Sequence, residues 1–298
     1  MIQETLKNPR AFHLAGVIPV AGRKLDFEMP WHDALMPIAP NYLAVERCVT
    51  ECAYIGCETI WIVCNDDIEP LIRHRLGDYI EDPVWVKRLS VTERGKRIPI
   101  FYVPIHPNDR DKRDCLAWSV IHGALVATKV SRNISRWTAP DSYYVSFPYG
   151  VYPVEFLQTL RTDASSEHGL TLRYLNKTFN ENEYLAFTFD AIELRKMKNL
   201  VLREGTGIKK PGNPLEENVK LPVEKRYSAR FFSLDKVFKP VYNSGQSRTF
   251  AEPLFYYNID SWDGYKQYLA SEESTMIIKP EREIMAYREF NPIGVDNV

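Results

Sequence analysis

The sequence predicts an α/β fold with a three-layer, mostly parallel, Rossmann-like sheet. Two apolar runs, residues 14–20 and 59–63, flank residues 42–54, whose apolar side chains recur with helical spacing. This order of strand, helix and strand is typical of a βαβ unit with parallel strands. Strands and helices go on alternating as far as about residue 160, a pattern that favours one layered α/β sheet.

The elements after this first unit follow from the same two patterns. Helical periodicity predicts helices over residues 68–79 and 115–127, and apolar runs predict strands over residues 85–91, 98–105 and 142–147. Beyond them we expect helices at residues 153–160, 190–199 and 262–270, and strands at residues 170–175, 184–189 and 255–259.

The C-terminal third is less regular than the rest. Residues 203–222 are rich in glycine, proline and charge, which predicts a long flexible loop. We therefore expect an α/β domain over residues 1–200. The C-terminal segment, residues 201–298, would carry this loop and form an irregular extension that partly completes the same domain.

Composition and charge argue against several classes of function. The net charge is -1, so no global basic field indicates binding to nucleic acid or to an anionic membrane. No apolar run approaches the roughly 20 residues that cross a bilayer, and the N-terminus lacks the apolar core of a secretory signal. The five cysteines are an odd number, which favours a reducing compartment over a disulfide framework. We therefore expect a cytoplasmic protein with buried thiols rather than a zinc site, since paired Cys-x-x-Cys knuckles are missing from the sequence.

Two short motifs carry a resemblance to a known family. Residues 17–22, VIPVAG, match the start of a glycine-rich loop that continues in that family as Gly-Thr-Arg. Residues 34–38, ALMPI, match the second half of a Pro-Lys-Ala-Leu-Leu-Pro-type segment. On these motifs the chain resembles the sugar-nucleotide pyrophosphorylases, nucleotidyltransferases with a Rossmann-like sheet of the GT-A type. The similarity covers roughly residues 14–190, with a further echo near residues 255–270.

The resemblance implies a nucleotide or sugar-nucleotide ligand, held by the loop after the first strand. Ala21 and Gly22 stand at the start of that loop, and Arg23 and Lys24 follow where the family has its second glycine and its threonine. The phosphate cradle is therefore shortened, although the two basic side chains could still reach an anion. In the next motif, Asp33 replaces a lysine that neutralises phosphate charge in the family.

The family's metal site is also altered. Its chemistry needs Mg²⁺, and Mg²⁺ needs carboxylate ligands. One family aspartate follows the strand that matches residues 143–147, and another comes from an Asp-x-Gly-Thr segment. Here Tyr149 and Asn258 stand at those positions. Asp260 and Asp263 are the candidates for a relocated metal site, and Mg²⁺ is expected only if the chain is active.

Candidate catalytic acids are Asp33 and Asp260. His32 and Asp33 form either an acid–base pair or part of a solvated loop, and neighbours in sequence need not point the same way. Asp260 stands two residues after Asn258, so in a continuous strand it would share the same face.

Three hypotheses follow. The first is a diverged nucleotidyltransferase-like protein that lacks standard Mg²⁺-dependent pyrophosphorylase activity and serves as a nucleotide or sugar-nucleotide binding protein or in an assembly. The second is an active nucleotidyltransferase, or a glycosyltransferase of the same fold class, with a relocated acidic site. The third is a purely structural subunit of a larger assembly, in which the C-terminal third and residues 203–222 contact a protein partner. Fold alone does not decide among them.

Overall fold

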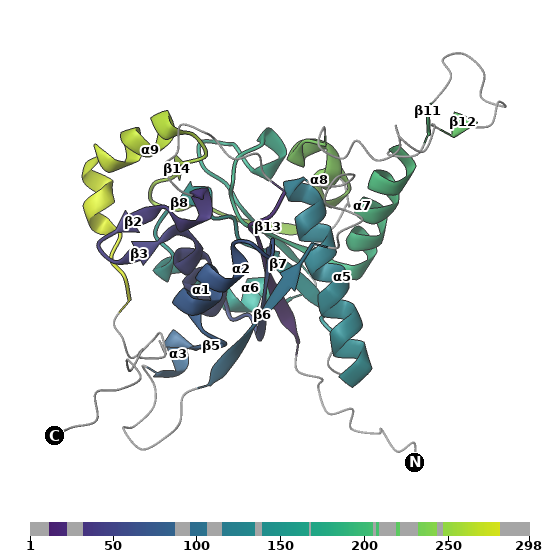
Figure 1. Cartoon of the computed structure of the whole chain (residues 1–298), viewed down its shortest axis with the longest axis horizontal. Helices are drawn as coiled ribbons and strands as arrows, with labels where there is room; N and C mark the ends of the chain where they lie inside the picture. The colour runs from purple at the N-terminus through teal and green to yellow at the C-terminus, as the bar shows by residue number, and fades with distance from the viewer. Residues whose placement is uncertain are drawn as a thin grey trace.

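The structure is a computed structural model that describes residues 12–22, 32–86, 96–105, 115–134, 139–166, 168–204, 207–208, 219–220, 232–242 and 247–280. Its centre is an eight-stranded sheet with the order β13-β9-β10-β7-β1-β4-β6-β5. Figure 1 shows α1 (Ala44–Ile55) and α5 (Leu116–Ile134) on opposite sides of this sheet. The strands are β1 (Leu14–Pro19), β4 (Thr59–Cys64), β5 (Tyr79–Glu81), β6 (Arg97–Pro104), β7 (Ser142–Val145), β9 (Gly169–Leu172), β10 (Phe187–Asp190) and β13 (Arg248–Ala251).

Most of these strands run in one direction. β1 pairs in parallel with β4 on one side and with β7 on the other, and β4 pairs in parallel with β6. β10 runs antiparallel to both β7 and β9, and β13 runs parallel to β9. Of the strands described in this sheet, only β10 and the edge strand β5 oppose the common direction. The predicted α/β class with a mostly parallel sheet is confirmed.

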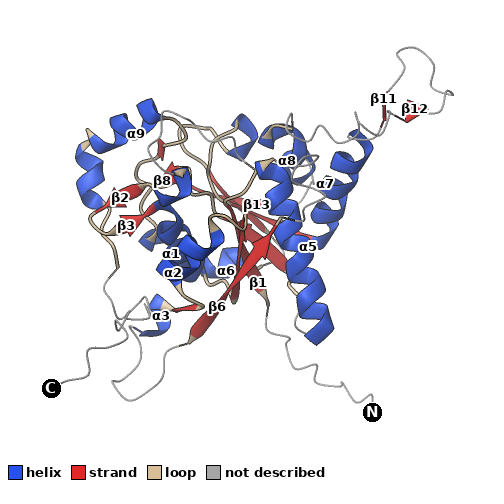
Figure 2. Ribbon diagram, in the orientation of Figure 1, coloured by secondary structure: helices blue, strands red, loops and turns tan. Residues whose placement is uncertain are grey.

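Helices cover both faces of the sheet, which makes the three predicted layers (Figure 2). Alternate residues of β1 point to opposite faces. Leu14 and Ile18 join a core cluster with α1 (Ala44–Ile55), whereas Ala15 and Val17 join a second cluster with α5 (Leu116–Ile134). α2 (Glu69–Leu76) and α6 (Arg161–Ala164) lie on the α1 face, and α7 (Ala191–Glu204) and α8 (Leu234–Tyr242) lie on the α5 face.

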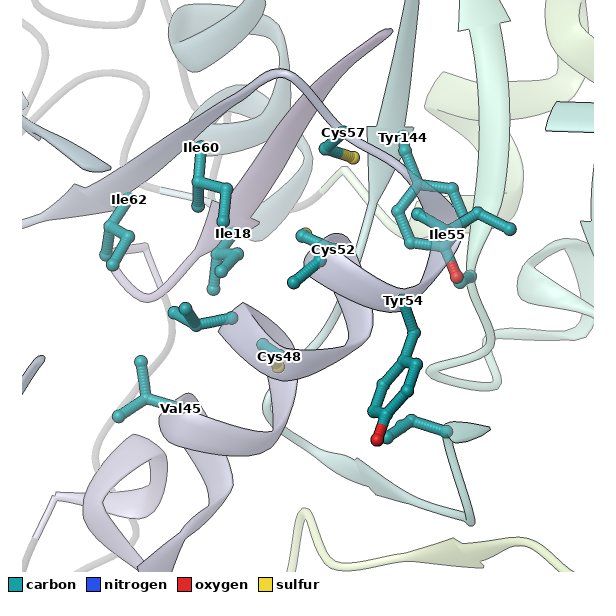
Figure 3. Close-up of a cluster of buried hydrophobic side chains, with 14 of the residues drawn as sticks. Ile18, Val45, Cys48, Cys52, Tyr54, Ile55, Cys57, Ile60, Ile62 and Tyr144 are labelled. Atoms are coloured by element: carbon teal, nitrogen blue, oxygen red, sulfur yellow. The ribbon is translucent and has the colours of Figure 1, made fainter. Parts of the chain in front are cut away.

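The α1 face is packed by small and branched side chains. Figure 3 shows Ile18 and Ile60 of the sheet pointing towards Cys48 and Cys52 of α1. Helix and strand approach so closely that a Cβ on Gly16 would lie 2.7 Å from the Sγ of Cys52. A glycine is therefore required at this position of β1 for α1 to sit against the sheet.

The last described α-helix packs against two small sheets. β2 (Pro37–Ala39) pairs with β3 (Tyr42–Leu43), and β8 (Gly150–Val151) pairs with β14 (Tyr257–Asn258). A third core cluster joins them to α9 (Trp262–Leu269). The hydroxyls of Tyr265 and Tyr268 donate to the main-chain oxygens of Pro37 and Ile38. Residues more than 200 positions apart in the sequence are thereby tied together, since these bonds span 228 and 230 residues.

One expected element is wrong in type. A strand was expected over residues 85–91, but the structure has the short helix α3 (Pro83–Val86), and residues 87–91 lie outside the described part. The Oδ1 of Asp82 accepts the N–H of Val84 at 3.0 Å, and proline suits the first turn, so helical geometry starts here. The helix expected over residues 153–160 begins as the 3-10 helix η3 (Glu155–Leu160) and continues directly as α6.

The expected loop over residues 203–222 lies mostly outside the described residues. Its described parts are the end of α7 and the short antiparallel pair β11 (Gly207–Ile208) and β12 (Val219–Lys220). Further along, β13 joins the edge of the main sheet beside β9, so the C-terminal segment contributes a strand to it.

The five cysteines are all free and buried. Burial raises the pKa of the Cys48 thiol to about 11, which keeps this group protonated at neutral pH. Within the described residues, no group of three or more His, Cys, Asp and Glu side chains could hold a metal ion. None of the described helices is both long and apolar enough to cross a membrane.

Candidate functional site

The region beyond the carboxyl ends of β1 and β7 is the candidate site. From β1 the chain crosses through α1 on one face of the sheet to β4, and it later reaches β7 through α5 on the other face. The order of strands therefore reverses between β1 and β7. Open α/β sheets bind their ligands at such a switch point, and the resemblance implies a ligand at the same place.

The described start of the loop after β1 is held by main-chain hydrogen bonds. The N–H groups of Val20 and Ala21 both donate to the main-chain oxygen of Val63, at 2.8 and 2.9 Å. The Oγ of Ser119 on α5 donates to the Ala21 oxygen at 2.6 Å. The two N–H groups are therefore engaged by β4 instead of pointing towards a phosphate.

Gly22 fixes the direction in which this loop leaves the sheet. Its φ is +88°, and a Cβ there would lie 2.5 Å from the main-chain carbonyl carbon of Cys115. Only glycine fits such a close approach in the left-handed region. Gly22 therefore lies against the residue that precedes α5. Arg23 and Lys24, the two basic candidates for phosphate binding, lie outside the described residues.

Three aromatic side chains occupy the α5 side of the site: Phe147, Tyr149 and Tyr184, here called the aromatic cluster. Tyr149 is fully buried, and its hydroxyl donates to the Val20 oxygen at 3.2 Å. Its ring packs edge-on against Tyr184 with 5.1 Å between centroids, and Phe147 packs on the same ring at 5.7 Å. Tyr149, at the position where the resemblance implies a metal-binding aspartate, is thus a packed ring whose hydroxyl is bonded to main chain.

The α1 side of the site is polar and equally buried. Here the carboxylate of Glu51 accepts four hydrogen bonds. We call Glu51 and its four donors, Arg47, Tyr144, Ser146 and Tyr152, the Glu51 network. Tyr144 and Tyr152 donate to Oε1 at 2.6 and 2.7 Å. Ser146, the first residue after β7, and Arg47 donate to Oε2. A carboxylate with this many donors is satisfied within the protein and has no coordination left for a metal.

The Glu51 network also fixes the end of β7. Arg47, with only 1% of its side chain exposed, donates from Nη2 to the Phe147 oxygen at 2.7 Å and lies 4.5 Å from the centre of the Tyr152 ring. Burial raises the pKa of Tyr144 and of Tyr152 well above the usual range, and the nearby charge of Glu51 raises it further. Both phenols therefore remain hydrogen-bond donors.

Asp33 is not part of a solvated loop. It begins the short 3-10 helix η1 (Asp33–Leu35) and is only 2% exposed, so the solvated-loop interpretation is wrong for this residue. His32 is half-buried, and its Nδ1 accepts the N–H of Ala34 at 3.2 Å, which caps the same turn. The imidazole therefore has a local structural contact.

The two acids near the end of the chain differ in their surroundings. Asp260 is half-buried; its Oδ2 accepts a hydrogen bond from the Tyr184 hydroxyl at 3.4 Å. Asp263 lies in the first turn of α9, where its side chain is 82% exposed and pairs with Lys266 at 2.7 Å. Two tyrosines thus connect Asp260 to the loop after β1, since Tyr184 packs on Tyr149. Asp263 is a surface residue.

Asp260 does not continue the strand that contains Asn258. β14 ends at Asn258, and the N–H of Asp260 folds back to donate to the Asn258 Oδ1 at 3.0 Å. The expectation that the two side chains share a strand face is therefore wrong. Asn258 acts as a turn-forming residue, a role for which its side-chain carbonyl is well suited.

A further acid that sequence patterns do not reveal is Glu183. It precedes β10, and its Oε2 lies 3.1 Å from the Tyr256 hydroxyl and 3.5 Å from the Asn258 Nδ2. Its Oε1 pairs with Lys177 at 3.3 Å. No motif signals this role, because Glu183 lies in an irregular segment and meets Tyr256 and Asn258 only through the fold.

The site does not provide a fit for the Mg²⁺ that the fold implies. At the two aspartate positions of the resemblance stand Tyr149, which is bonded to main chain, and Asn258, which forms a turn. Glu51 is saturated by donors, and in the described part of the chain no cluster of acids, histidines or cysteines of the required size exists.

Comparison with known proteins identifies the fold. No family model and no curated protein sequence matches the chain. Among solved structures it is similar to a putative glucose-1-phosphate thymidylyltransferase from Bacillus anthracis in complex with a sucrose. The TM-score is 0.55 at 9% identity, over 91% of this chain and 98% of that chain. It is also similar to an apo UDP-glucose pyrophosphorylase, with a TM-score of 0.51 at 12% identity, over 89% of this chain and 100% of that one. The chain therefore has the nucleotidyltransferase-like fold that its motifs resemble.

Proposed function

We propose that this chain is a nucleotidyltransferase-like protein that does not carry out Mg²⁺-dependent nucleotidyl transfer. It would act instead as a nucleotide or sugar-nucleotide binding protein or as part of a protein assembly. The observation that carries the proposal is Tyr149. It takes the place of a metal-binding aspartate, is fully buried, and bonds to the end of β1. Restoring a metal there would require both a carboxylate and the removal of packed rings.

The ligand part of the proposal rests on what remains of the loop after β1. Arg23 and Lys24 follow directly in the sequence after Gly22, the last described residue at the switch point, and both can bind a phosphate. The N–H groups of Val20 and Ala21 are engaged by Val63, so we assign the binding of phosphate to the side-chain charge of Arg23 and Lys24. We therefore expect an anion-dependent site in which salt weakens binding.

Two measurements test this proposal. The protein is incubated with nucleoside triphosphates, sugar 1-phosphates and Mg²⁺, and pyrophosphate release is followed; we expect no turnover above background. Thermal unfolding is then measured with nucleotides and nucleotide sugars. A ligand at a hundred times its dissociation constant should stabilise the fold by about 2.7 kcal/mol. Arg23→Ala should reduce that shift, whereas Lys266→Ala, which lies on α9, serves as the matched control. Turnover that requires Mg²⁺ would refute the proposal.

A second candidate function is an active transferase with a relocated acidic site. The favouring observation is that the Glu183 carboxylate accepts from the Asn258 Nδ2, while the carboxylate of Asp260, two residues further on, accepts from the Tyr184 hydroxyl. This candidate predicts metal-dependent pyrophosphate release that Asp260→Ala abolishes and that Asp263→Ala leaves unchanged. Activity that survives Asp260→Ala would exclude it.

The compartment and the domain organisation are part of the same proposal. Five free, buried thiols support a reducing, cytoplasmic setting. The pairing of β13 with β9 supports a single domain in which residues 201–298 complete the unit formed by residues 1–200. Limited proteolysis tests the second point, since a fragment that ends near residue 200 should not remain folded once β13 is removed.

A further inference from the structure

The outer surfaces of α5 and α7 carry positive charge. The two helices pack side by side on one face of the sheet (Figure 1). α5 contains no acidic residue, and its last two turns expose Lys129 and Arg132. On α7, Arg195 and Lys196 are exposed. We call these four cations the basic face.

The acid at the start of α7 is turned away from this surface. Glu193 has a side chain that is 2% exposed, and its Oε1 lies 3.8 Å from Nη1 of Arg248 on the sheet. Its Oε2 accepts the N–H of Asp190, whose Oδ1 accepts the N–H of Glu193 in return. The first turn of α7 therefore directs its carboxylates inwards and its cations outwards.

Cations on other surfaces of the molecule lie beside carboxylates. Arg73 on α2 is 3.1 Å from Asp78, and Lys266 on α9 is 2.7 Å from Asp263. Among the residues that the structure describes, no ion pair includes a Lys or Arg of α5 or α7. The net charge of -1 thus conceals a segregated charge, since the basic face is not neutralised by a described carboxylate.

The cations of the two helices lie at the same end of the layer. Tyr143 of β7 is opposite Phe189 of β10 in the sheet, and the two rings stack with 5.1 Å between centroids. The Tyr143 hydroxyl is hydrogen-bonded to Thr128 near the end of α5, and Phe189 precedes α7 by two residues. The C-terminal end of α5 and the first turns of α7 therefore lie over neighbouring strands.

Two branched apolar side chains project from these same helix ends. Ile134, the last residue of α5, is 75% exposed, and Ile192 in the first turn of α7 is 62% exposed. Ile192, Arg195 and Lys196 stand at positions i, i+3 and i+4, so they share one face of α7. An aliphatic side chain beside cations on a surface helix is the arrangement that enters the headgroup region of a bilayer.

The same helices lack the groups with which a protein holds bases. α7 contains no aromatic residue, and the one aromatic residue of α5, Trp118, is 3% exposed. Single-stranded nucleic acids are bound by stacking their bases on exposed rings next to cations. Exposed isoleucines without exposed rings therefore favour a lipid surface over a nucleic acid.

We propose that the basic face docks on an anionic lipid surface, with Ile134 and Ile192 inserted among the headgroups. The cations would lie against the lipid phosphates and carboxylates, where each adds to the attraction. Attraction of this kind acts within about 10 Å at physiological salt, so the local charge decides and not the net charge. The docked end lies near the start of β7, whereas the candidate site lies beyond its carboxyl end. The site stays open, and the proposal does not depend on ligand binding.

Sedimentation of the full chain with lipid vesicles tests the proposal. The vesicles are phosphatidylcholine with about 30% phosphatidylserine, in about 0.1 M salt, and vesicles of phosphatidylcholine alone are the comparison. We expect the chain to sediment with the anionic vesicles and to stay in solution with the neutral ones. Raising the salt to about 0.5 M should weaken binding at least tenfold, because the charges are then screened.

Charge reversal tests the basic face itself. Arg195→Glu combined with Lys196→Glu should weaken vesicle binding roughly 100-fold, since each reversal removes one attraction and adds one repulsion. The matched control is Arg73→Glu combined with Lys266→Glu, which changes the net charge equally at side chains that are 56% and 54% exposed on α2 and α9. This control should bind as the wild type does.

The isoleucines are tested separately from the charges. Ile134→Ser combined with Ile192→Ser should weaken vesicle binding about tenfold or more and leave its salt dependence unchanged, because only apolar burial is lost. Leu71→Ser, at a leucine of α2 that is 58% exposed, is the control and should have no effect.

Three results would overturn the proposal. The first is a wild-type chain that stays in solution with anionic vesicles or binds neutral vesicles equally well. The second is vesicle binding that either the charge reversal or the isoleucine pair leaves unchanged. The third is tighter binding to a DNA duplex of about 30 base pairs than to the anionic vesicles at equal salt, which would assign the basic face to nucleic acid.

Discussion

The two faces of the sheet complete the carboxyl ends of β1 and β7 with opposite chemistry. On the α5 face, Phe147, Tyr149 and Tyr184 pack as rings, with one hydroxyl bonded to the Val20 oxygen. On the α1 face, a buried carboxylate is surrounded by four donors. The same switch point is therefore filled by packed rings on one face and by a hydrogen-bonded carboxylate on the other. The packed rings are stabilised by many small van der Waals contacts. In the Glu51 network, by contrast, the loss of one member leaves a buried polar group without its partner.

The largest effect is expected on the polar face. Glu51→Leu leaves the guanidinium of Arg47 buried without its carboxylate and deprives two phenols and a hydroxyl of their acceptor. Breaking a buried ion pair in this way costs about 3–5 kcal/mol. Urea unfolding measures the loss. As a control, the double variant Arg47→Met with Glu51→Leu should recover part of it, because no uncompensated charge remains. A single variant as stable as the wild type would show that the network is not a unit.

On the aromatic face, shape should matter more than the hydroxyl. Tyr149→Ala removes a fully buried ring, and truncations of this kind cost about 3 kcal/mol or more. Tyr149→Phe keeps the ring and loses one hydrogen bond to the Val20 oxygen, worth about 1 kcal/mol. Chemical denaturation of the two variants separates the contributions. Equal losses of stability in the two variants would mean that the hydroxyl contact, and not ring packing, stabilises this side of the site.

Alkaline pH should weaken the polar face through its tyrosines. Burial raises the pKa of Tyr144 and of Tyr152 in the folded state, whereas in the unfolded chain the pKa is about 10. The stabilisation is therefore complete below pH 10 and is lost as pH rises from there towards the folded-state pKa. The free energy of unfolding should fall by about 1.4 kcal/mol per pH unit for each such group. In Tyr144→Phe and Tyr152→Phe the slope above pH 10 should be shallower than in the wild type.

The sheet is predictable from the sequence because it depends on local patterns. Apolar runs of strand length and one helical period are enough to place β1, α1 and β4 close to their observed bounds. The parallel direction follows from the intervening helix. Where prediction fails, at α3, a local capping contact from Asp82 prevails over an apolar run.

The candidate site is less predictable because its contacts join distant residues. The resemblance implies a metal ligand at the position of Tyr149, but the bond of Tyr149 to Val20 spans 129 residues and its burial follows from the fold. Glu183 reaches Asn258 across 75 residues. The Glu51 network likewise joins α1 to residues 144, 146 and 152, and no periodicity signals a carboxylate with four donors. Asp33 was expected either in an acid–base pair with His32 or in a solvated loop, yet it begins η1 and its side chain is buried.

The smallest effects on the free energy of unfolding are expected for Asp260 and Asp263, the two acids beyond β14. Comparing the two effects tests which acid belongs to the site. Asp263→Ala removes a partner of Lys266 at the surface and should change the free energy of unfolding by no more than about 0.5 kcal/mol. Asp260→Ala removes the acceptor of the Tyr184 hydroxyl and should cost about 1 kcal/mol. Tyr184→Phe provides the matched control, since combining it with Asp260→Ala should add little. Suppose instead that Asp260→Ala and Asp263→Ala lose the same stability, and that the losses from Asp260→Ala and Tyr184→Phe add in full when the two are combined. The contact between Asp260 and Tyr184 is then incidental, and Asp260 does not belong to the aromatic face.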